Sequence, residues 1–429
     1  MVLALLIAWT IPGTGVFRLP AGVTEIASEL KLPDGAHDLT ITGDHTTLHA
    51  AASFQGRAIF SCRGCRRIHF TNFSIDGNRA ALEKPLPFAP SDKTFASVFP
   101  NPGILIEDTD GISIDHVAFA NVTNFSVLIG QSKNVAIDHV SVKDSGSRNA
   151  KGRNNTSGGI LLEEGTETFA VTDSTFRNIP GNGVWTHSRY MAPRNRWGKI
   201  LRNQFFEIAR DAIQVGHAAN VRVEDNDGAH IGYPAELVDI EDQAYPAALD
   251  TAGDVDGTTY TRNRFTEVDG KCIDLDGFHD GDVTGNSCIN RPDAALYPFG
   301  NVGILFNDSH PHTRSKDIRL TGNLLDGVKF TGIYTFGTGH IIAHNRLLNV
   351  NLAHCNEEAA KYGCYYPKDE PDALQSGIYL GRGFLWSEPA RGIVVEDNEI
   401  SGFGMTTRCV GYAAGVQPGS NTVRNNRCE

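Results

Sequence analysis

The chain has 429 residues, and its 50 Asp and Glu outnumber its 38 Lys and Arg, so the formal net charge is −12. A nucleic-acid partner requires a basic surface, and this charge balance argues against that class of function. Apolar residues make up 40% of the chain and charged residues 21%, a composition that excludes a disordered protein. No apolar run is long enough for a membrane-spanning helix, so no membrane partner is expected.

The N-terminal segment, residues 1–35, is predicted to close one end of the fold. Residues Val2 to Trp9 are apolar like the central stretch of a secretion signal, but no basic residue precedes them and no Ala-x-Ala cleavage site follows. A signal remnant and a first capping strand therefore both remain open. Residues 11–35 are predicted to form the cap that a repeat protein needs at its end.

An internal repeat fills the rest of the chain, residues 36–429. Each repeat contains an alternating segment that ends at a polar turn residue, most often Asn. These turn residues are His116, His139, Ser174, Asn203, Asn226, Asn263, Asn286, Asn323, Asn345, Asn398 and Asn426. Where no insertion intervenes, the step is 22 or 23 residues, which is too short for helical repeats. Asn at this place is expected to adopt a left-handed backbone and to bond to the Asn of the next repeat.

A second motif lies between these turns and consists of a small residue followed by an alternating strand. Examples begin at Gly159, Gly183, Gly303, Gly332 and Gly377. Short strand–turn–strand units of this period can bury an apolar face only by stacking on one another. The sequence therefore predicts an all-β fold, a parallel β-helix of about 12 coils that forms one domain after the cap. A β-sandwich would need hairpin signals and a propeller a period of about 40 residues, and neither is present.

The repeats resemble those of the pectin-lyase-like superfamily of right-handed parallel β-helix proteins, from about residue 36 to the C-terminus. That superfamily includes polygalacturonase-like hydrolases, pectate lyases, alginate epimerases and phage tailspikes, so the resemblance implies the fold and no single activity. The Asn-Thr-Asp and Gly-His-Gly signatures of the polygalacturonase-like family are missing. Gly216-His217-Ala218 is a partial match to the second signature.

The strand after each small residue has a predictable outward face, because alternation turns every second side chain away from the coil interior. The first outward column reads Leu161, Trp185, Gln214, Asp250, Asp274, Leu305, Tyr334 and Tyr379. The second reads Glu163, His187, Gly216, Ala252, Asp276, Asn307, Phe336 and Gly381. Carboxylates in the middle and aromatic residues at both ends are typical of a sugar-binding groove.

The carboxylates of these columns are the predicted catalytic groups. Coils lie ~4.8 Å apart, so Asp250 and Asp274 are expected side by side, with Asp276 ~6.5–7 Å from Asp274 along the strand. Carboxylates this close raise one another's pKa, so one can donate a proton while another acts as base or nucleophile, as glycoside hydrolysis requires. Three aspartates on the equivalent sheet carry hydrolysis in polygalacturonase-like enzymes, which this trio resembles. We predict His279 as an acid/base partner and leave retention and inversion both open.

The predicted substrate-binding residues are the other polar and aromatic side chains on or beside the columns. They are Glu163, Trp185, His187, Gln214, His217, Lys271, Asn307, Tyr334, Tyr379 and Arg382. Long insertions are expected to wall the same face, at residues 79–102, 145–158, 188–198, 228–247, 290–302 and 351–376. The predicted function is a glycoside hydrolase that acts on a polysaccharide or oligosaccharide, as a monomer and without a resident cofactor or metal.

Three alternatives use the same residues differently. Adjacent aspartates also bind Ca²⁺. In β-helix lyases of uronate polymers, that ion neutralises the substrate carboxylate while Lys or Arg removes a proton, and Lys271 and Arg382 are the candidates here. The segment from Asp276 to Asp280 loosely resembles the Asp-Pro-His-Asp motif of alginate epimerases. In a non-catalytic carbohydrate-binding or adhesin-like β-helix, the aspartates would only decorate a solvated face.

Eight cysteines form four pairs of near neighbours in the sequence, and proximity alone predicts their disulfides. The predicted pairs are Cys62–Cys65, Cys272–Cys288, Cys355–Cys364 and Cys409–Cys428. The first pair also has the spacing of half a zinc site, but no second half follows. Oxidised pairs require an oxidising compartment, so a secreted or periplasmic protein is expected.

Overall fold

The computed structural model describes residues 9–87, 90, 92–98, 100, 103–241, 244–310, 313–356, 362–364, 370–383 and 388–429. Most of the apolar N-terminal stretch and parts of the insertions at 79–102, 228–247 and 351–376 lie outside the described residues. The described helices are short: α1 (Arg79–Leu82), α2 (Phe95–Val98), η1 (Ala235–Leu237), η2 (Ala294–Leu296), η3 (Pro371–Leu374) and η4 (Pro418–Ser420). None of them is long and apolar enough to cross a membrane.

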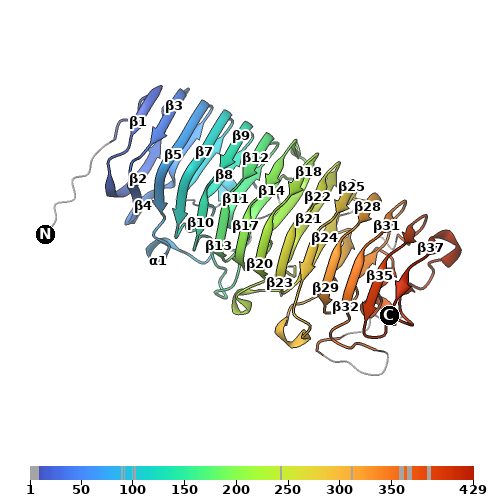
Figure 1. Ribbon diagram of the computed structural model, residues 1–429. Helices are drawn as coiled ribbons and strands as arrows, with labels where there is room; N and C mark the ends of the chain where they lie inside the picture. Colours follow the sequence, from blue (N-terminus) through green and yellow to red (C-terminus); the bar gives the residue numbers. More distant parts are fainter. Residues whose placement is uncertain are drawn as a thin grey trace.

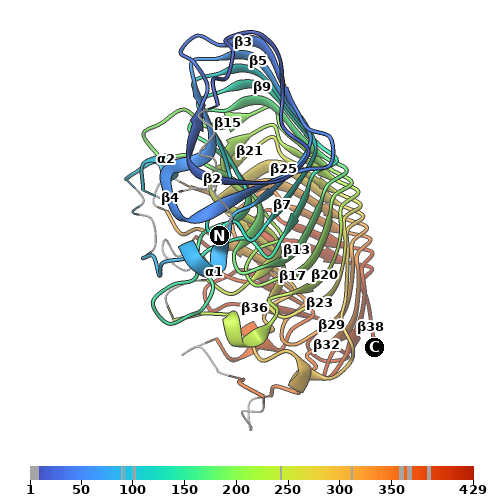
Figure 2. The same cartoon turned by 90° about the vertical axis from the view of Figure 1, so that its left-hand side faces the viewer.

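The strands stack coil on coil into a single parallel β-helix (Figure 1). Each strand pairs in parallel with the equivalent strand of the next coil, so the coils stack directly on one another along the whole length. A view close to the stacking direction shows successive coils superimposed, with the sheets as walls (Figure 2). The predicted fold class is therefore confirmed.

Each coil contributes to three sheets, of which the first, called the site sheet here, contains the small-residue motif. The site sheet consists of β6 (Ile104–Glu107), β8 (Val127–Gly130), β11 (Gly158–Glu163), β14 (Asn182–His187), β18 (Ile213–Ala219), β21 (Ala247–Asp256), β24 (Lys271–Asp276), β27 (Ile304–Asn307), β30 (Ile333–Thr335), β33 (Ile378–Leu380) and β36 (Val410–Tyr412). Long strands that bend between sheets are β2 (Gly22–Lys31), β4 (Thr46–Arg63), β5 (Arg66–Asp76) and β7 (Asp110–Ala120).

The other two sheets flank the asparagine turn. The second sheet contains β1 (Gly15–Arg18), β3 (His37–Thr42), β9 (Lys133–Asp138), β12 (Glu167–Thr172), β16 (Lys199–Leu201), β19 (Arg222–Glu224), β22 (Thr259–Thr261), β25 (Phe278–Thr284), β28 (Lys316–Thr321), β31 (Ile341–Ala343), β34 (Val394–Glu396) and β37 (Thr422–Arg424), with β15 (Asn195–Arg196) beside it. The third contains β10 (Ser141–Lys143), β13 (Thr175–Ile179), β17 (Gln204–Ile208), β20 (Asp227–Ile231), β23 (Arg264–Val268), β26 (Ser287–Ile289), β29 (Leu324–Val328), β32 (Arg346–Val350), β35 (Glu399–Gly402) and β38 (Arg427–Cys428).

The stack begins inside the segment expected to be a cap. Strands β1 and β2 pair in parallel with β3 and β4, so residues 15–31 already form the first coil. Their outward edge carries exposed Val16 and Val23.

The core is a set of apolar columns inside the coils. The inward residue after each small residue is aligned from coil to coil and almost fully buried: Ile160, Val184, Ile213, Leu249, Ile273, Ile304, Ile333 and Ile378. Each such side chain stabilises the fold by about 2 kcal/mol through burial. Because the columns are continuous, the register of one coil fixes that of the next.

A ladder of asparagine side chains runs along the turn between the second and third sheets. The Oδ1 atom of Asn226 accepts hydrogen bonds from the backbone N–H of Asn203 at 2.9 Å and from its Nδ2 at 3.0 Å. The same two bonds continue coil by coil through Asn263, Asn286, Asn323, Asn345, Asn398 and Asn426. The predicted ladder is therefore confirmed.

The left-handed backbone at this turn belongs to the residue before each asparagine, so that part of the prediction is wrong. Arg202, Asp225 and Arg262 have φ angles of 56°, 55° and 55°. The asparagine that follows points inward, where the Nδ2 of Asn203 also donates to the carbonyl of Val171 at 2.9 Å. Asparagine is required there because a buried turn leaves backbone N–H and C=O groups that need partners.

Four disulfides join the cysteine pairs predicted from proximity, Cys62–Cys65, Cys272–Cys288, Cys355–Cys364 and Cys409–Cys428. The cysteine motif at 62–65 is thus a disulfide in this structure and not half of a zinc site. Four disulfides fit a protein from an oxidising compartment.

We expect Asn203→Ala to lower the free energy of unfolding by about 3 kcal/mol, because it leaves the buried backbone N–H of Ser174 and the carbonyl of Val171 without their partner. The matched control is Gln204→Ala, which removes an exposed amide from the next position of the same coil. The midpoints of urea denaturation measure both changes. Equal shifts for the two variants would contradict a stabilising ladder.

Candidate functional site

The outward face predicted for the site sheet is present in the register of its strands. Pairing aligns the first column as Leu161, Trp185, Gln214, Asp250, Asp274, Leu305, Tyr334 and Tyr379. In the second column, pairing aligns Glu163 with His187, Gly216 with Ala252, and Asp276 with Asn307. The alternate residues of the same strands, such as Leu249, Ile273 and Leu275, belong to the core. Both columns therefore face away from the coil interior.

Three carboxylates lie together near the middle of this face. Asp250 of β21 and Asp274 of β24 are direct neighbours, ~4.8 Å apart at the backbone. Asp276 lies two residues further along β24, on the same side of the strand. The three residues are only 9%, 3% and 7% exposed. Although they point outward, the loops cover them, so they lie in surroundings with little water.

A lysine and a further aspartate complete the cluster at the edge of the site sheet. The Lys271 ammonium forms a buried ion pair with Asp274. Asp211, which is 3% exposed, accepts a hydrogen bond from the backbone N–H of Ala247 at 3.0 Å, and Arg210 lies 3.5 Å from it. Asp211 and Arg210 were not predicted from the sequence, because both precede the small residue and the alternating pattern begins only after it.

Burial and mutual repulsion favour the protonated state of two carboxyl groups in the cluster. Burial raises the pKa of Asp250 well above its ordinary value, and the charges of Asp211 and Asp274 raise it further, against the opposing effect of Lys271. Burial also raises the pKa of Asp211. For Lys271, burial alone would lower the pKa, but Asp274 and Asp250 outweigh it and the net shift is upward. Burial and the neighbouring charges therefore favour the protonated form of Asp250, which lies beside an ion pair.

Asp276 has a separate environment beneath a loop. It accepts hydrogen bonds from the backbone N–H of Ser309 at 2.7 Å and from the Ser309 hydroxyl. Burial, followed by the charge of Asp274, raises the pKa of Asp276 to about 6, and the bonds from Ser309 oppose the shift. Asp276 is therefore mostly ionised at neutral pH.

A tyrosine between two histidines forms the wall beside Asp276. The ring of Tyr190 stacks on His310 with centroids 3.6 Å apart, and lies 4.7 Å from the ring of His217. A Cβ atom on Gly253 would be 3.0 Å from the Tyr190 hydroxyl, so glycine lets the tyrosine approach the backbone here. Tyr190 and His310 are in insertions after the site strands, and the sequence did not indicate which insertion residues return to the face.

Several buried polar atoms on this face have no hydrogen-bond partner among the described residues. They include Oδ1 of Asp274, Nε1 of Trp185, Nδ1 of His187 and Nδ1 of His217. Native proteins pair nearly all such groups, so each of these atoms could accept or donate a further hydrogen bond. Burial also lowers the pKa of His187 to about 4, so its imidazole is neutral.

The N-terminal end of the face is covered and does not form the open groove that the sequence predicted. Helix α2 places Phe95 against Trp185, with ring centroids 4.9 Å apart. Glu163 accepts hydrogen bonds from the backbone N–H groups of Phe95 at 2.8 Å and Ala96 at 2.9 Å. Burial raises the pKa of Glu163 to about 7. Leu161 is fully buried under the same segment, so Glu163 and Trp185 hold the helix instead of facing solvent.

The C-terminal end is covered in a similar way. Tyr334 donates its hydroxyl to the carbonyl of Arg382 at 3.0 Å, and Tyr379 donates to Glu370 at 3.1 Å. Arg382 pairs with the same Glu370. The predicted tyrosine platforms are thus covered by Glu370, from the insertion before β33, and by Arg382, from the segment after it.

Of the remaining predicted residues, Gln214 and Asn307 lie next to the three aspartates and His279 does not. Gln214 aligns with Asp250 and accepts a hydrogen bond from Asn182 at 2.7 Å, and Asn307 is aligned with Asp276. His279 lies outside this group, because the chain turns at Gly277 into β25 of the second sheet. There both of its nitrogens are engaged, by Asp254 at 2.9 Å and by Asp280 at 2.6 Å.

The three aspartates do not form a preformed cation cage. In the part of the chain that the structure describes, three-residue groups with ligand atoms within 4.8 Å of one another are Asp138–His139–Asp173 and Glu163–Glu164–His187. The carboxylates of the second group already bind α2 and Arg189. Calcium at Asp250, Asp274 and Asp276 stays a prediction.

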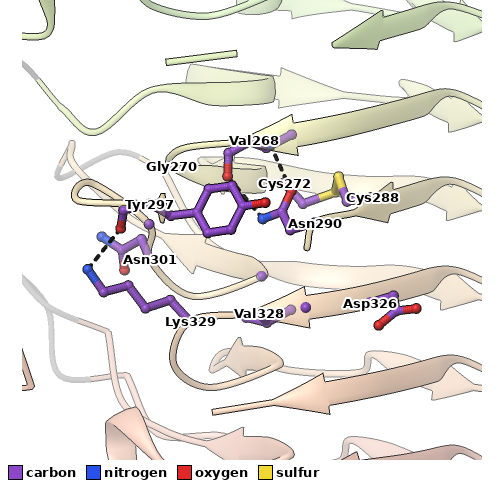
Figure 3. A pocket seen from close by; sticks show the side chains of 13 residues that line it. Val268, Gly270, Cys272, Cys288, Asn290, Tyr297, Asn301, Asp326, Val328 and Lys329 are labelled. Atoms are coloured by element: carbon purple, nitrogen blue, oxygen red, sulfur yellow. Dashed lines mark hydrogen bonds between the residues drawn. A yellow bond between two sulfur atoms is a disulfide. The ribbon is translucent and has the colours of Figure 1, made fainter. Parts of the chain in front are cut away.

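A small cavity beside the Cys272–Cys288 disulfide lies at the bend between the third sheet and the site sheet (Figure 3). Its volume is about 20 Å³, which is room for one water molecule. Lys329, which lines it, donates to the carbonyls of Tyr297 at 2.9 Å and Pro298 at 3.1 Å. This cavity is too small for a sugar.

Comparison with known proteins gives the same architecture. A family model described as "Right handed beta helix region" matches residues 58–233. No curated protein matches the sequence. Similar solved structures include a thermostable α-1,3-glucanase catalytic unit from Streptomyces thermodiastaticus (TM-score 0.56, 12% identity, 96% of this chain and 64% of that chain). Another is the surface adhesin PfbA of Streptococcus pneumoniae, with a TM-score of 0.53 and 14% identity over 79% of this chain and 82% of that chain. A third is the A-module of a mannuronan C-5 epimerase from Azotobacter vinelandii, with a TM-score of 0.51 and 13% identity over 79% of this chain and 88% of that chain. At these identities the likeness concerns the fold, and the chain is a right-handed parallel β-helix protein.

Proposed function

We propose that the protein is a glycoside hydrolase that uses Asp250, Asp274 and Asp276. The observation that supports this most is the cluster itself: three carboxylates on two adjacent strands, buried on one outward face, with Lys271 as the cation in contact with them. Burying so many like charges costs several kcal/mol, and a fold has no structural need for it. Carboxyl groups in different protonation states are what glycosidic bond cleavage requires.

Asp250 acts as the general acid in this proposal. Its raised pKa favours the protonated form of the carboxyl group, which donates a proton to the glycosidic oxygen as the bond to the anomeric carbon breaks.

Asp276 acts as the general base and takes a proton from the attacking water. It lies one coil across and two residues along from Asp250, which gives a backbone separation of about 8 Å. Inverting enzymes hold their carboxyl groups about 6.5–9.5 Å apart to leave room for that water, so inversion is the expected outcome. Asp274, which is ion-paired with Lys271, lies between the two and stabilises positive charge at the anomeric carbon.

The structural neighbours support a carbohydrate substrate without naming it. The glucanase and the epimerase named above act on glycans, and both have this fold. We further propose that the protein works as a monomer outside the cytoplasm, where its disulfides persist.

The elimination alternative has less support. The two basic residues predicted for that role are both engaged in ion pairs, Lys271 with Asp274 and Arg382 with Glu370. The net charge of −12 also disfavours an anionic polymer. The likeness to PfbA keeps a binding-only adhesin as the second candidate, since that protein has the same fold and is described as an adhesin.

We expect the protein to release new reducing ends from at least one neutral glycan in a panel of α-1,3-glucan, β-1,4-xylan and inulin. Asp250→Asn, Asp274→Asn and Asp276→Asn should each lower kcat/KM by about 100-fold or more. Asp227→Asn, an exposed aspartate on the third sheet, serves as the control and should leave kcat/KM unchanged. Turnover of polymannuronate or polygalacturonate with ultraviolet absorbance of unsaturated products would instead indicate elimination. Binding without turnover would indicate an adhesin.

The pH dependence of kcat/KM should show an acidic limb. Asp276 works as a base only when it is ionised, and its pKa of about 6 means that kcat/KM rises with pH through that value. At higher pH, kcat/KM should fall as Asp250 loses its proton. Initial rates across the pH range measure both limbs. If kcat/KM instead decreased steadily as the pH is raised from about 5, Asp276 would be excluded as the base.

The first sugar released should have the anomeric configuration opposite to that of the bond cleaved. Proton NMR of the product, recorded before mutarotation, distinguishes the two anomers. Retention of configuration would mean that the two working carboxyl groups are about 5–5.5 Å apart and would favour the neighbouring pair Asp250 and Asp274.

A further inference from the structure

The first outward column of the site sheet is covered on every coil. From Leu161 to Tyr379, each of its residues is 9% exposed or less. In the second column, His187, Ala252 and Asn307 are only partly buried. A polymer that bound along the solenoid would need many open coils, whereas the first column offers none.

The N-terminal wall is fixed to the face by its backbone. Glu163 accepts the N–H groups of Phe95 and Ala96, and Arg57 donates to the carbonyl of Ala96 at 2.8 Å. The ring of Phe95 fills the space between Trp185 and His187, with centroid distances of 4.9 and 4.7 Å. A sugar therefore cannot stack on Trp185 while α2 is in place.

The C-terminal wall is equally close. A Cβ atom on Gly381 would lie 2.7 Å from the ring of Tyr334, so the backbone at this position rests directly on the tyrosine. The ion pair between Arg382 and Glu370 secures the same segment. Both ends of the predicted groove are thus occupied by the chain itself.

We infer that the site takes the end of a glycan chain or a short oligosaccharide, and that α2, positioned by Glu163, is the wall that excludes internal segments of a polymer. This inference rests on the proposed hydrolysis. Its structural basis is that α2 covers one end of the outward face and residues Gly381 and Arg382 cover the other, so Asp250 and Asp276 lie between two walls. Glu163 acts here as a positioning residue and does not touch the reacting atoms.

The test compares each neutral polymer of the panel with its tetrasaccharide. The wild-type protein should release mono- or disaccharides while the viscosity of the polymer stays nearly constant. A rapid fall in viscosity with a ladder of intermediate oligosaccharides would overturn the inference but leave the proposed hydrolysis standing. An absence of turnover on every polymer and tetrasaccharide would refute the proposed hydrolysis, and the inference with it.

Variants that weaken the attachment of α2 to the site sheet should change the products. In Glu163→Ala, we expect kcat/KM on the polymer to rise about tenfold relative to the tetrasaccharide, through a lower KM, with kcat on the tetrasaccharide nearly unchanged. Phe95→Ala keeps the backbone bonds of α2 and should show the same direction if Glu163→Ala fails to fold. Glu236→Ala, an exposed glutamate in another insertion, is the control. An unchanged product pattern in both Glu163→Ala and Phe95→Ala would overturn the role of α2.

Discussion

Parallel pairing between coils is the constraint on which the rest of this structure depends. Each strand must bond to the strand one coil away, so equivalent residues of successive coils lie ~4.8 Å apart in straight columns. Apolar columns inside the coil form the core. The asparagine ladder satisfies the backbone groups of a buried turn through Asn203, Asn226 and their successors. A one-residue slip would turn the core columns outward, so the register is strongly determined.

The same pairing brings charges together that would otherwise avoid one another. Asp250 and Asp274 are adjacent because their strands are adjacent, and the covering loops remove the water that would screen them. Burial and repulsion favour the protonated form of Asp250, and Lys271 forms an ion pair with Asp274. Two carboxyl groups of the same kind thereby acquire different environments, which a solvated surface would not provide.

The loops determine what can reach the carboxylates. They are inserted where a coil leaves or enters the site sheet, so they can fold over it without disturbing the stack. Phe95 covers Trp185 at one end, and residues 370–383 cover Tyr334 at the other. At the centre, Tyr190 and Ser309 approach Asp276 from two different insertions. A continuous outward face thus becomes a short site.

The sequence by itself determined the repeat, the fold class, the disulfide partners and the columns that contain Asp250 and Asp274. These follow from period and alternation, which are local properties of the chain, and from short distances between cysteines. It could not assign Asp211, because that residue lies at a bend where alternation stops, nor place His279, because the turn at Gly277 moves it to another sheet. Only the tertiary structure decided that Glu163, Trp185 and the two tyrosines are covered. Burial by an insertion depends on where a long loop folds back, and neither periodicity nor composition contains that information.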